Sequence, residues 1–448
     1  MNIQFQTYIA LSVVMFLEYA IWGAWAPVLA TRLLGPLKMT GKQTGWIYAT
    51  LPLACIVAPF LSGWAADSFI NAEYILLAAH FLGAILLFMA ARQTQFKPLF
   101  LVMLAYSACY AATLPLANSV LFAVKPDGAT AGKVFIWAPV AWALVGWSLT
   151  GWRMTRKTQG DGSDCLYLAS ALSLLMVAGC VFVSVVAPCK PQGQGNAFAD
   201  ALSFMTGNSN FLIFLVVSMV VAGLMQFYFL GTGQFMQDSG VEGKHVPASM
   251  ALAQIAQAAA TWFLFQWVQD TFGFKGTFLV GATCWFVLYL VYAIGKPKEL
   301  VIACQPLHGF AYVFFIIVGQ VFTNSIAPTG IQSSMQALIF AVTTGVGMFL
   351  GTQFAGIVMD SCKADGKFQW RKVWLVPAVI TLLGIIALGV KFQDPPKAPA
   401  QEKASPATPQ QDAAVETPQG EPPVKIPAET QDDKAGTSQA EPAPEATK

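Results

Sequence analysis

Charged residues are scarce in this chain. Only 11% of its 448 residues are Asp, Glu, Lys or Arg, whereas 56% are hydrophobic. A soluble globular domain usually has about 25% charged residues. The composition therefore excludes an ordinary soluble domain. It indicates an integral membrane protein, surrounded by the lipid bilayer and with no nucleic-acid partner.

The sequence also lacks the patterns of metal sites and of active sites. Its eight cysteines include no C-x-x-C pair, and its three histidines lie at no ligand spacing from them. No segment holds a nucleophile, a base and an orienting group together. We therefore expect no metal, no cofactor and no enzymatic activity, and we interpret the cysteines as packing residues.

A cleavable signal peptide is missing as well. The first apolar run, about residues 7–30, is too long for the apolar region of a signal peptide and has no basic residues before it. It should remain as a transmembrane helix. With a span length of about 20 residues, the chain offers twelve candidate spans: 7–30, 45–66, 73–91, 97–123, 133–152, 165–187, 211–235, 247–268, 276–295, 299–323, 332–360 and 372–391.

These spans predict an all-α membrane protein built from two six-helix bundles. The longest polar interval, 188–210, is the predicted linker between an N-terminal bundle, 1–187, and a C-terminal bundle, 211–392. A weak repeat supports the division, because GWAADSF closes the second span and QWVQDTFGFKG closes the eighth, and such internal symmetry is typical of secondary transporters. Residues 393–448 predict a disordered tail, rich in Ala, Pro, Glu, Gln and Lys and without any aromatic residue.

The loop charges do not agree with a cytoplasmic N-terminus. In that orientation the inner loops would hold only Lys125, Lys133, Lys190 and Lys275, and most other basic residues of the predicted membrane region would lie outside. Cytoplasmic loops normally carry the excess of Lys and Arg. The charge count by itself therefore favours the opposite topology.

Polar side chains inside apolar spans are costly and are candidates for function. Glu18, in FLEYAIWGAW, is the clearest carboxylate in the middle of a span. In the fourth span, Pro115 should interrupt the helical hydrogen bonds and leave Asn118 facing a loosened backbone. We interpret His80 and His308 as packing or interfacial residues.

Amides are the other polar groups of the spans, and no Lys or Arg lies near the centre of any of them. Gln226 lies among aromatic residues, and Gln254 and Gln257 share one helix face. Amides recognise hydrogen-bonding edges, and aromatic rings cover flat apolar faces. The interior therefore suits an uncharged solute that has both features.

Five segments in order resemble the nucleoside:proton symporters of the major facilitator superfamily: FLEYAIWGAW, TLPLAN, QIAQ, HGFAYVFF with GQVF, and DGKFQWRKVW. The resemblance covers about residues 5–392. It implies twelve helices in two bundles, cytoplasmic termini in the bacterial inner membrane, and nucleoside import by alternating access through a site between the bundles. We prefer this orientation to the loop-charge count because it rests on several segments.

The resemblance also implies site residues, position by position. Trp142 and Tyr312 match aromatic site residues of the family, and Gln226 and Gln254 match two glutamines. Phe229 stands where the family has an asparagine. The substrate-binding residues that we predict from the resemblance and from the polar positions are Gln226, Gln254, Gln257, Trp142, Phe229, Tyr312 and Asn118.

Three ionisable residues of the family are absent here. Phe135 replaces an arginine, Gln257 a glutamate and Val313 an aspartate, whereas His308 stands where a tyrosine does. These losses keep the interior neutral. Glu18 is consequently the candidate proton carrier.

Several alternatives stay open at this point. Transport could be coupled to protons through Glu18, coupled through another carrier, or uncoupled. The substrate could be another neutral solute such as a sugar, and a transport-inactive membrane sensor is a further alternative. The tail carries no docking motif that would favour the sensor. We expect a monomer.

Overall fold

A computed structural model describes residues 5–68, 70–123, 134–156, 160–181, 197–328 and 332–394 of the chain. The regular elements in the described part of the N-terminal region are helices: α1 (Phe5–Trp25), α2 (Leu29–Leu34), α3 (Gly41–Ser68), α4 (Ala72–Arg92), α5 (Phe96–Ala123), α7 (Trp137–Thr155) and α8 (Asp164–Cys180). The predicted linker contains one helix, α9 (Ala197–Gly207). Most of the predicted tail lies outside the described residues.

The C-terminal region contains long helices and three π-helical stretches. Its elements are α10 (Ser209–Asp238), α11 (Val246–Ala259), η1 (Ala260–Leu264), α12 (Phe265–Ile294), α13 (Lys298–Ala303), α14 (Pro306–Ala311), η2 (Tyr312–Ile317), α15 (Val318–Ile326), α16 (Gln332–Phe340), η3 (Ala341–Gly347), α17 (Met348–Ser361) and α18 (Trp370–Lys391). A short hairpin joins β1 (Lys363–Ala364) to β2 (Lys367–Phe368). Its turn, Asp365–Gly366, has positive φ at both residues, as Asp-Gly hairpins require.

Nine helical segments in the described chain are long and apolar enough to cross a membrane. One of them, Val246–Ile294, has 49 residues. Its backbone angles at Gly273 are non-helical and divide it into two helical parts. Helices dominate because a bilayer offers no hydrogen-bond partners to an open backbone. The all-α membrane fold is therefore confirmed, whereas the total of twelve spans remains a prediction from the sequence.

Proline does not interrupt the helix that holds Asn118. Helix α5 continues through Pro115, and α3 likewise contains Pro52 and Pro59. A proline removes only one backbone donor, and neighbouring helices can compensate for that loss in a membrane protein. The expected interruption at Pro115 is therefore wrong.

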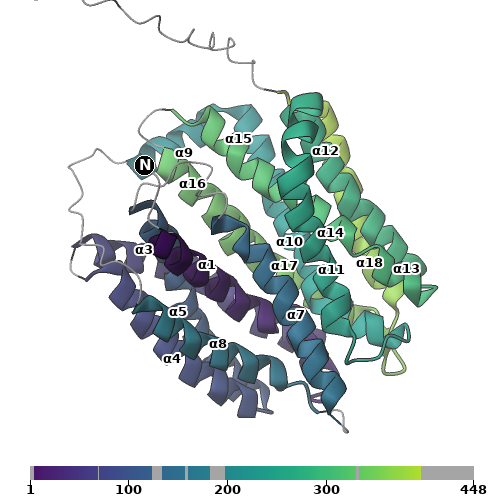
Figure 1. The fold of residues 1–448 in the computed structure, drawn as a ribbon. Helices are drawn as coiled ribbons and strands as arrows, with labels where there is room; N and C mark the ends of the chain where they lie inside the picture. Colours follow the sequence, from purple (N-terminus) through teal and green to yellow (C-terminus); the bar gives the residue numbers. More distant parts are fainter. Residues whose placement is uncertain are drawn as a thin grey trace, which may run out of the picture. The chain divides into compact units, whose positions relative to one another are not determined.

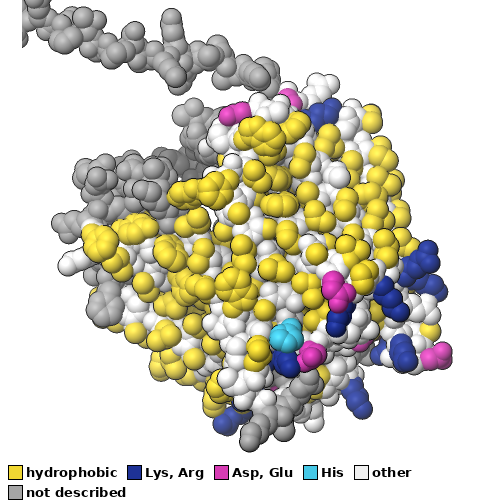
Figure 2. Space-filling view, turned by 45° about the vertical axis from the view of Figure 1, so that its right-hand side comes forward, with side chains coloured by type: hydrophobic (Ala, Val, Ile, Leu, Met, Phe, Trp, Pro, Cys, Tyr) yellow, Lys and Arg dark blue, Asp and Glu magenta, His cyan; other side chains and the backbone are white. Residues whose placement is uncertain are grey.

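The helices pack side by side in two sets (Figure 1). In the first set α3 packs on α5, α4 on α5 and α8, and α1 on α7 and α8; in the second, α12 packs on α18, α10 on α17, and α11 on α14. The two sets meet along two helix pairs, α3 with α17 and α7 with α11. Figure 2 shows hydrophobic side chains across the middle of one face, with Lys and Arg gathered mainly at its lower right edge.

Small residues bring the two sets together at the end where α3 begins and α17 ends, which we call the closed end. A Cβ atom at Gly45 would lie 2.5 Å from the carbonyl oxygen of Thr352. In the second helix pair, a Cβ atom at Gly146 would lie 3.0 Å from the carbonyl oxygen of Pro247. Glycine is needed here because the backbones approach more closely than a side chain allows.

Candidate functional site

A cavity of about 500 Å³ lies between the two sets of helices. Helices α1, α3 and α5 supply one part of its wall, and α10, η2, α15, α16 and η3 supply the other. None of the described residues that line it is Asp, Glu, Lys, Arg or His. Its polar groups are phenols, amides and hydroxyls: Tyr19, Tyr48, Tyr312, Asn118, Gln226, Gln320, Gln336, Ser218, Thr343 and Thr344.

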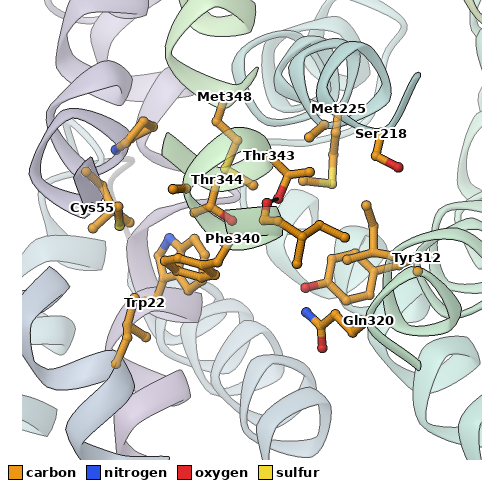
Figure 3. Close-up of a pocket in the computed structure, with 18 of the residues that line it drawn as sticks. Trp22, Cys55, Ser218, Met225, Tyr312, Gln320, Phe340, Thr343, Thr344 and Met348 are labelled. Carbon is orange, nitrogen blue, oxygen red and sulfur yellow. Dashed lines mark hydrogen bonds between the residues drawn. The ribbon is translucent and has the colours of Figure 1, made fainter. Parts of the chain in front are cut away.

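Aromatic rings and polar groups face each other across this cavity (Figure 3). The Tyr312 hydroxyl points toward the middle of the cavity, with the Gln320 amide beside it, whereas Trp22 and Phe340 lie on the opposite side. Tyr312 is the first residue of η2, and Phe340 directly precedes η3. π-Helical stretches are frequent at functional sites.

Gln226 and Ser218 are polar side chains of the wall that make no hydrogen bond to a described residue. Gln226 is only 4% exposed and makes no hydrogen bond there. The buried Ser218 Oγ also lacks a partner. A buried polar group without a partner costs free energy. The Ser218 Oγ atom is closed off by burial, so the Gln226 amide is the one of the two that can offer hydrogen bonds to a solute in the cavity.

Four of the residues predicted from the sequence line the cavity, and three do not. Asn118, Gln226, Phe229 and Tyr312 belong to its wall. Sequence reasoning missed Trp22, Phe340, Ser218, Thr343, Thr344 and Gln320. The only signal that could have found the polar ones was a hydroxyl or amide within an apolar span.

Trp142 and Gln254 lie behind the main cavity wall. They line a small side cavity of about 10 Å³, which shares Phe229 with the large cavity. The Trp142 ring lies 6.1 Å from Phe229 and 5.5 Å from Trp22, between ring centroids. Gln257 lines neither cavity. Helix α11 packs tightly against α7 and α14, and Gln254 lies with Trp142 and Tyr228 in the wall of the side cavity.

Val313 and Phe135 also lie away from the large cavity. Val313 is fully buried in an apolar cluster with Ala260, Val268 and Phe314. Phe135 is half-buried before α7 and packs against the hydrophobic core. Neither residue is part of the described cavity wall.

Glu18 is fully buried and does not line the cavity. Its Oε2 atom lies 2.9 Å from His80 Nε2, and its Oε1 atom accepts a hydrogen bond of 2.7 Å from Thr113. His80 is therefore an ionisable partner rather than a packing residue. Glu18 and His80 are 62 positions apart in the chain, so the sequence did not reveal this contact.

His308 is a packing residue, as the sequence suggested. Its ring stacks on Tyr228 with 3.8 Å between the centroids. Trp285 Nε1 donates a hydrogen bond of 3.2 Å to His308 Nδ1. Because an indole N–H can only donate, Nδ1 must accept and the imidazole is neutral.

Comparison with known proteins supports the membrane-transport fold. The nucleoside permease NupG of Escherichia coli (strain K12) is 26% identical over 412 residues, covering 88% of this chain and 96% of NupG. The xanthosine permease of the same organism is 26% identical over 405 residues, covering 86% and 96%. A crystal structure of NupG has a TM-score of 0.76 at 24% identity, covering 86% of this chain and all of that one. A D-xylose-proton symporter shares the fold, with a TM-score of 0.68 at 12% identity and coverage of 87% and 98%.

The family comparison covers nearly all of the chain outside the tail. A model of the family described as nucleoside H+ symporters matches residues 1–397. The curated relatives are permeases, which confirms a transporter rather than an enzyme. The structural relatives confirm the major facilitator fold. The chain belongs to the nucleoside H+ symporter family.

Proposed function

We propose that this protein carries nucleosides across the bacterial inner membrane by alternating access, with the cavity of about 500 Å³ as the substrate site. The observation that carries this proposal is the chemistry of the cavity wall, whose described residues combine aromatic rings, amides and hydroxyls and include no charged side chain. A nucleoside is uncharged and has a flat base with hydrogen-bonding edges and a polar ribose. The names of the permease relatives support this substrate class.

The wall offers a place for each part of a nucleoside. Rings such as Trp22, Phe340 and Tyr312 can cover the faces of the base. The unpaired Gln226 amide can bind a base edge with both its donor and its acceptor. The hydroxyls of Thr343 and Thr344 suit the ribose. Cavities that bind small molecules usually combine an apolar lining with a few placed polar groups in this way.

The same wall should reject nucleotides. A phosphate group needs Arg or Lys to compensate for the loss of its hydration. The described wall offers neither. A nucleotide would therefore leave its charge unpaired in the cavity, and we expect neutral nucleosides to be strongly preferred.

Orientation follows from the proposed cytoplasmic termini. Helix α1 begins at the cytoplasmic side in that orientation, so the closed end at Gly45 and Thr352 faces the periplasm. The cavity is built within one chain, and the proposed working unit is accordingly a monomer. Reporter fusions to each terminus test the orientation, and a periplasmic signal from either fusion would contradict it.

Uptake by proteoliposomes tests the function directly. Vesicles containing the purified protein should take up labelled uridine and adenosine faster than empty vesicles do. Unlabelled nucleosides should compete, whereas uridine monophosphate and xylose should not. Competition by xylose as strong as that by uridine would favour a sugar permease instead.

A further inference from the structure

A buried cluster of four side chains lies inside the first set of helices. Glu18 of α1 contacts His80 of α4 through Oε2 and Nε2, and accepts from Thr113 of α5 through Oε1. His80 Nδ1 lies 3.4 Å from Ser173 Oγ of α8. Glu18 and His80 are 0% and 2% exposed.

The hydrogen bonds around the pair fit one shared proton. Ser173 donates its hydroxyl hydrogen to the backbone oxygen of His80, at 3.2 Å. The Ser173 lone pair then faces Nδ1, which fits the tautomer that carries its hydrogen on Nδ1. One further proton then lies between His80 Nε2 and Glu18 Oε2, because two bare acceptors would repel each other. The pair is neutral overall whether that proton resides on nitrogen or on oxygen, which fits its complete burial.

Few other ionisable groups face this pair. Glu18 interacts electrostatically with the phenols of Tyr19, Tyr106 and Tyr110 and with the thiol of Cys180. Phenols and thiols are neutral at physiological pH. Helix α7 contacts α1 near the pair through the rings of Trp137 and Phe16, which carry no charge. Glu73, a buried carboxyl in the first turn of α4, also interacts electrostatically with Cys180, whereas Glu18 and His80 contact each other directly.

Helix α1 connects the pair to the cavity. Tyr19 and Trp22 line the cavity from α1, and they follow Glu18 by one and four residues on the same helix. Tyr110 donates a hydrogen bond of 2.7 Å to the backbone oxygen of Glu18, and its ring lies 6.3 Å from that of Trp22. A change of charge at Glu18 therefore acts on the helix that contacts the substrate.

We propose that the Glu18–His80 pair is the proton-binding site that couples transport to a proton gradient, a proposal that rests on the function proposed above. The one-proton pair is the loaded form. When α1 moves and water reaches the pair, the shared proton passes to water on the side of higher pH and leaves a glutamate beside a neutral imidazole. Reloading takes one proton from water on the side of lower pH. No other bond changes.

Two variants separate coupling from transport. Glu18→Gln keeps the shape and the hydrogen bond from Thr113 but cannot titrate, and His80→Gln removes the proton-sharing partner. Ser170→Ala is the matched control, because Ser170 also links α8 to α4, through the backbone oxygen of Ala84, but does not contact the pair. Three signals are measured in proteoliposomes: uridine exchange without a gradient, uridine accumulation under an inward pH gradient, and uridine-driven acidification reported by trapped pyranine.

Wild type and Ser170→Ala should show all three signals. Glu18→Gln should keep exchange but lose accumulation and acidification, and His80→Gln should keep exchange and move the pH dependence of accumulation. If Glu18→Gln does not fold, as judged by size-exclusion chromatography, His80→Gln decides the question.

Accumulation and acidification at wild-type level in a folded Glu18→Gln variant would overturn the proposal. So would a wild type that exchanges uridine but ignores the pH gradient, although the proposed function would then stand. Absence of uridine exchange in wild type would overturn the proposed function itself.

Discussion

Asp360 caps the N-terminus of helix α3 from the other set of helices. Its Oδ1 accepts from the backbone N of Gly41 at 2.6 Å, and its Oδ2 accepts from that of Lys42 at 2.8 Å. The first N–H groups of a helix have no partner within the helix, and a carboxylate is favourable at that end. Asp360 therefore holds α3 to the end of α17 at the closed end.

A second cap of the same kind joins the other helix pair. Thr150 Oγ1, near the end of α7, accepts from the backbone N of Ala248 in the first turn of α11, at 3.0 Å. In both cases a side chain near the end of one helix accepts hydrogen bonds from the first backbone N–H groups of a helix in the other set. Opening the closed end must break both caps, so they favour the conformation seen here.

Replacing Asp360 with Ala should shift the protein toward the opposite conformation, because loss of such a cap costs about 0.5–2 kcal/mol. The measurement is alkylation of Cys55, which lines the cavity, by an impermeant maleimide added from the closed-end side, in a variant without other cysteines. Labelling should be faster than in the parent. Glu242→Gln is the control, because Glu242 pairs with Lys244 in an exposed loop. Equal rates for Asp360→Ala and the parent would show that the cap does not hold the closed end.

Gln226→Ala should weaken nucleoside binding by about 1–3 kcal/mol if a buried substrate group loses its partner. Gln254→Ala should have a smaller effect, because Gln254 lies in the side cavity rather than in the main wall. Binding is measured by calorimetry on purified protein. Gln266→Ala serves as control, since this exposed amide bonds Asp270 outside the cavity. A larger effect at Gln254 than at Gln226 would place the substrate elsewhere.

Truncation after Pro395 should leave transport intact, because the remaining tail is too polar to pack on the helices. Asp394 should be kept, since its Oδ1 accepts a hydrogen bond of 2.7 Å from the backbone N of Lys275, just after the non-helical Gly273. We therefore expect Asp394→Ala to lower the thermal stability of the detergent-solubilised protein, whereas the truncation should not. Loss of uptake in the truncated protein would give the tail a role in transport.

Acid should destabilise the loop between α7 and α8 through Asp161. Burial raises the pKa of this carboxyl, but hydrogen bonds from Ser163 and the guanidinium of Arg32 outweigh burial and hold the pKa below its usual value. Because the pKa of Asp161 is lower in the folded state, the ionised carboxylate stabilises the fold at any pH above its unfolded-state pKa of about 3.9. This stabilisation is lost as the pH falls through the lower folded-state pKa. In thermal melts, Asp161→Asn should reduce the loss of stability below about pH 4. An unchanged pH dependence would exclude this role.

The sequence alone predicted the features that depend on local composition. Long apolar runs become helices because the bilayer offers the backbone no other hydrogen-bond partners. The described spans are helical, as this argument predicts. Gln226, Asn118 and Glu18 stood out because polar groups in apolar spans are costly and need a reason. The five segments that resemble a transporter family, taken in their order along the chain, also identified the family correctly.

Only the tertiary structure decided which of these polar groups meet. The Glu18–His80 pair joins residues 62 apart, and the Asp360 cap on Lys42 joins residues 318 apart. No periodicity along the chain encodes such distances. The positions of Gln254 and Gln257 outside the main cavity follow from the tight packing of α11 against two neighbours. Composition thus determines which segments enter the membrane, whereas the side chains that share a proton or line the cavity depend on how the helices pack.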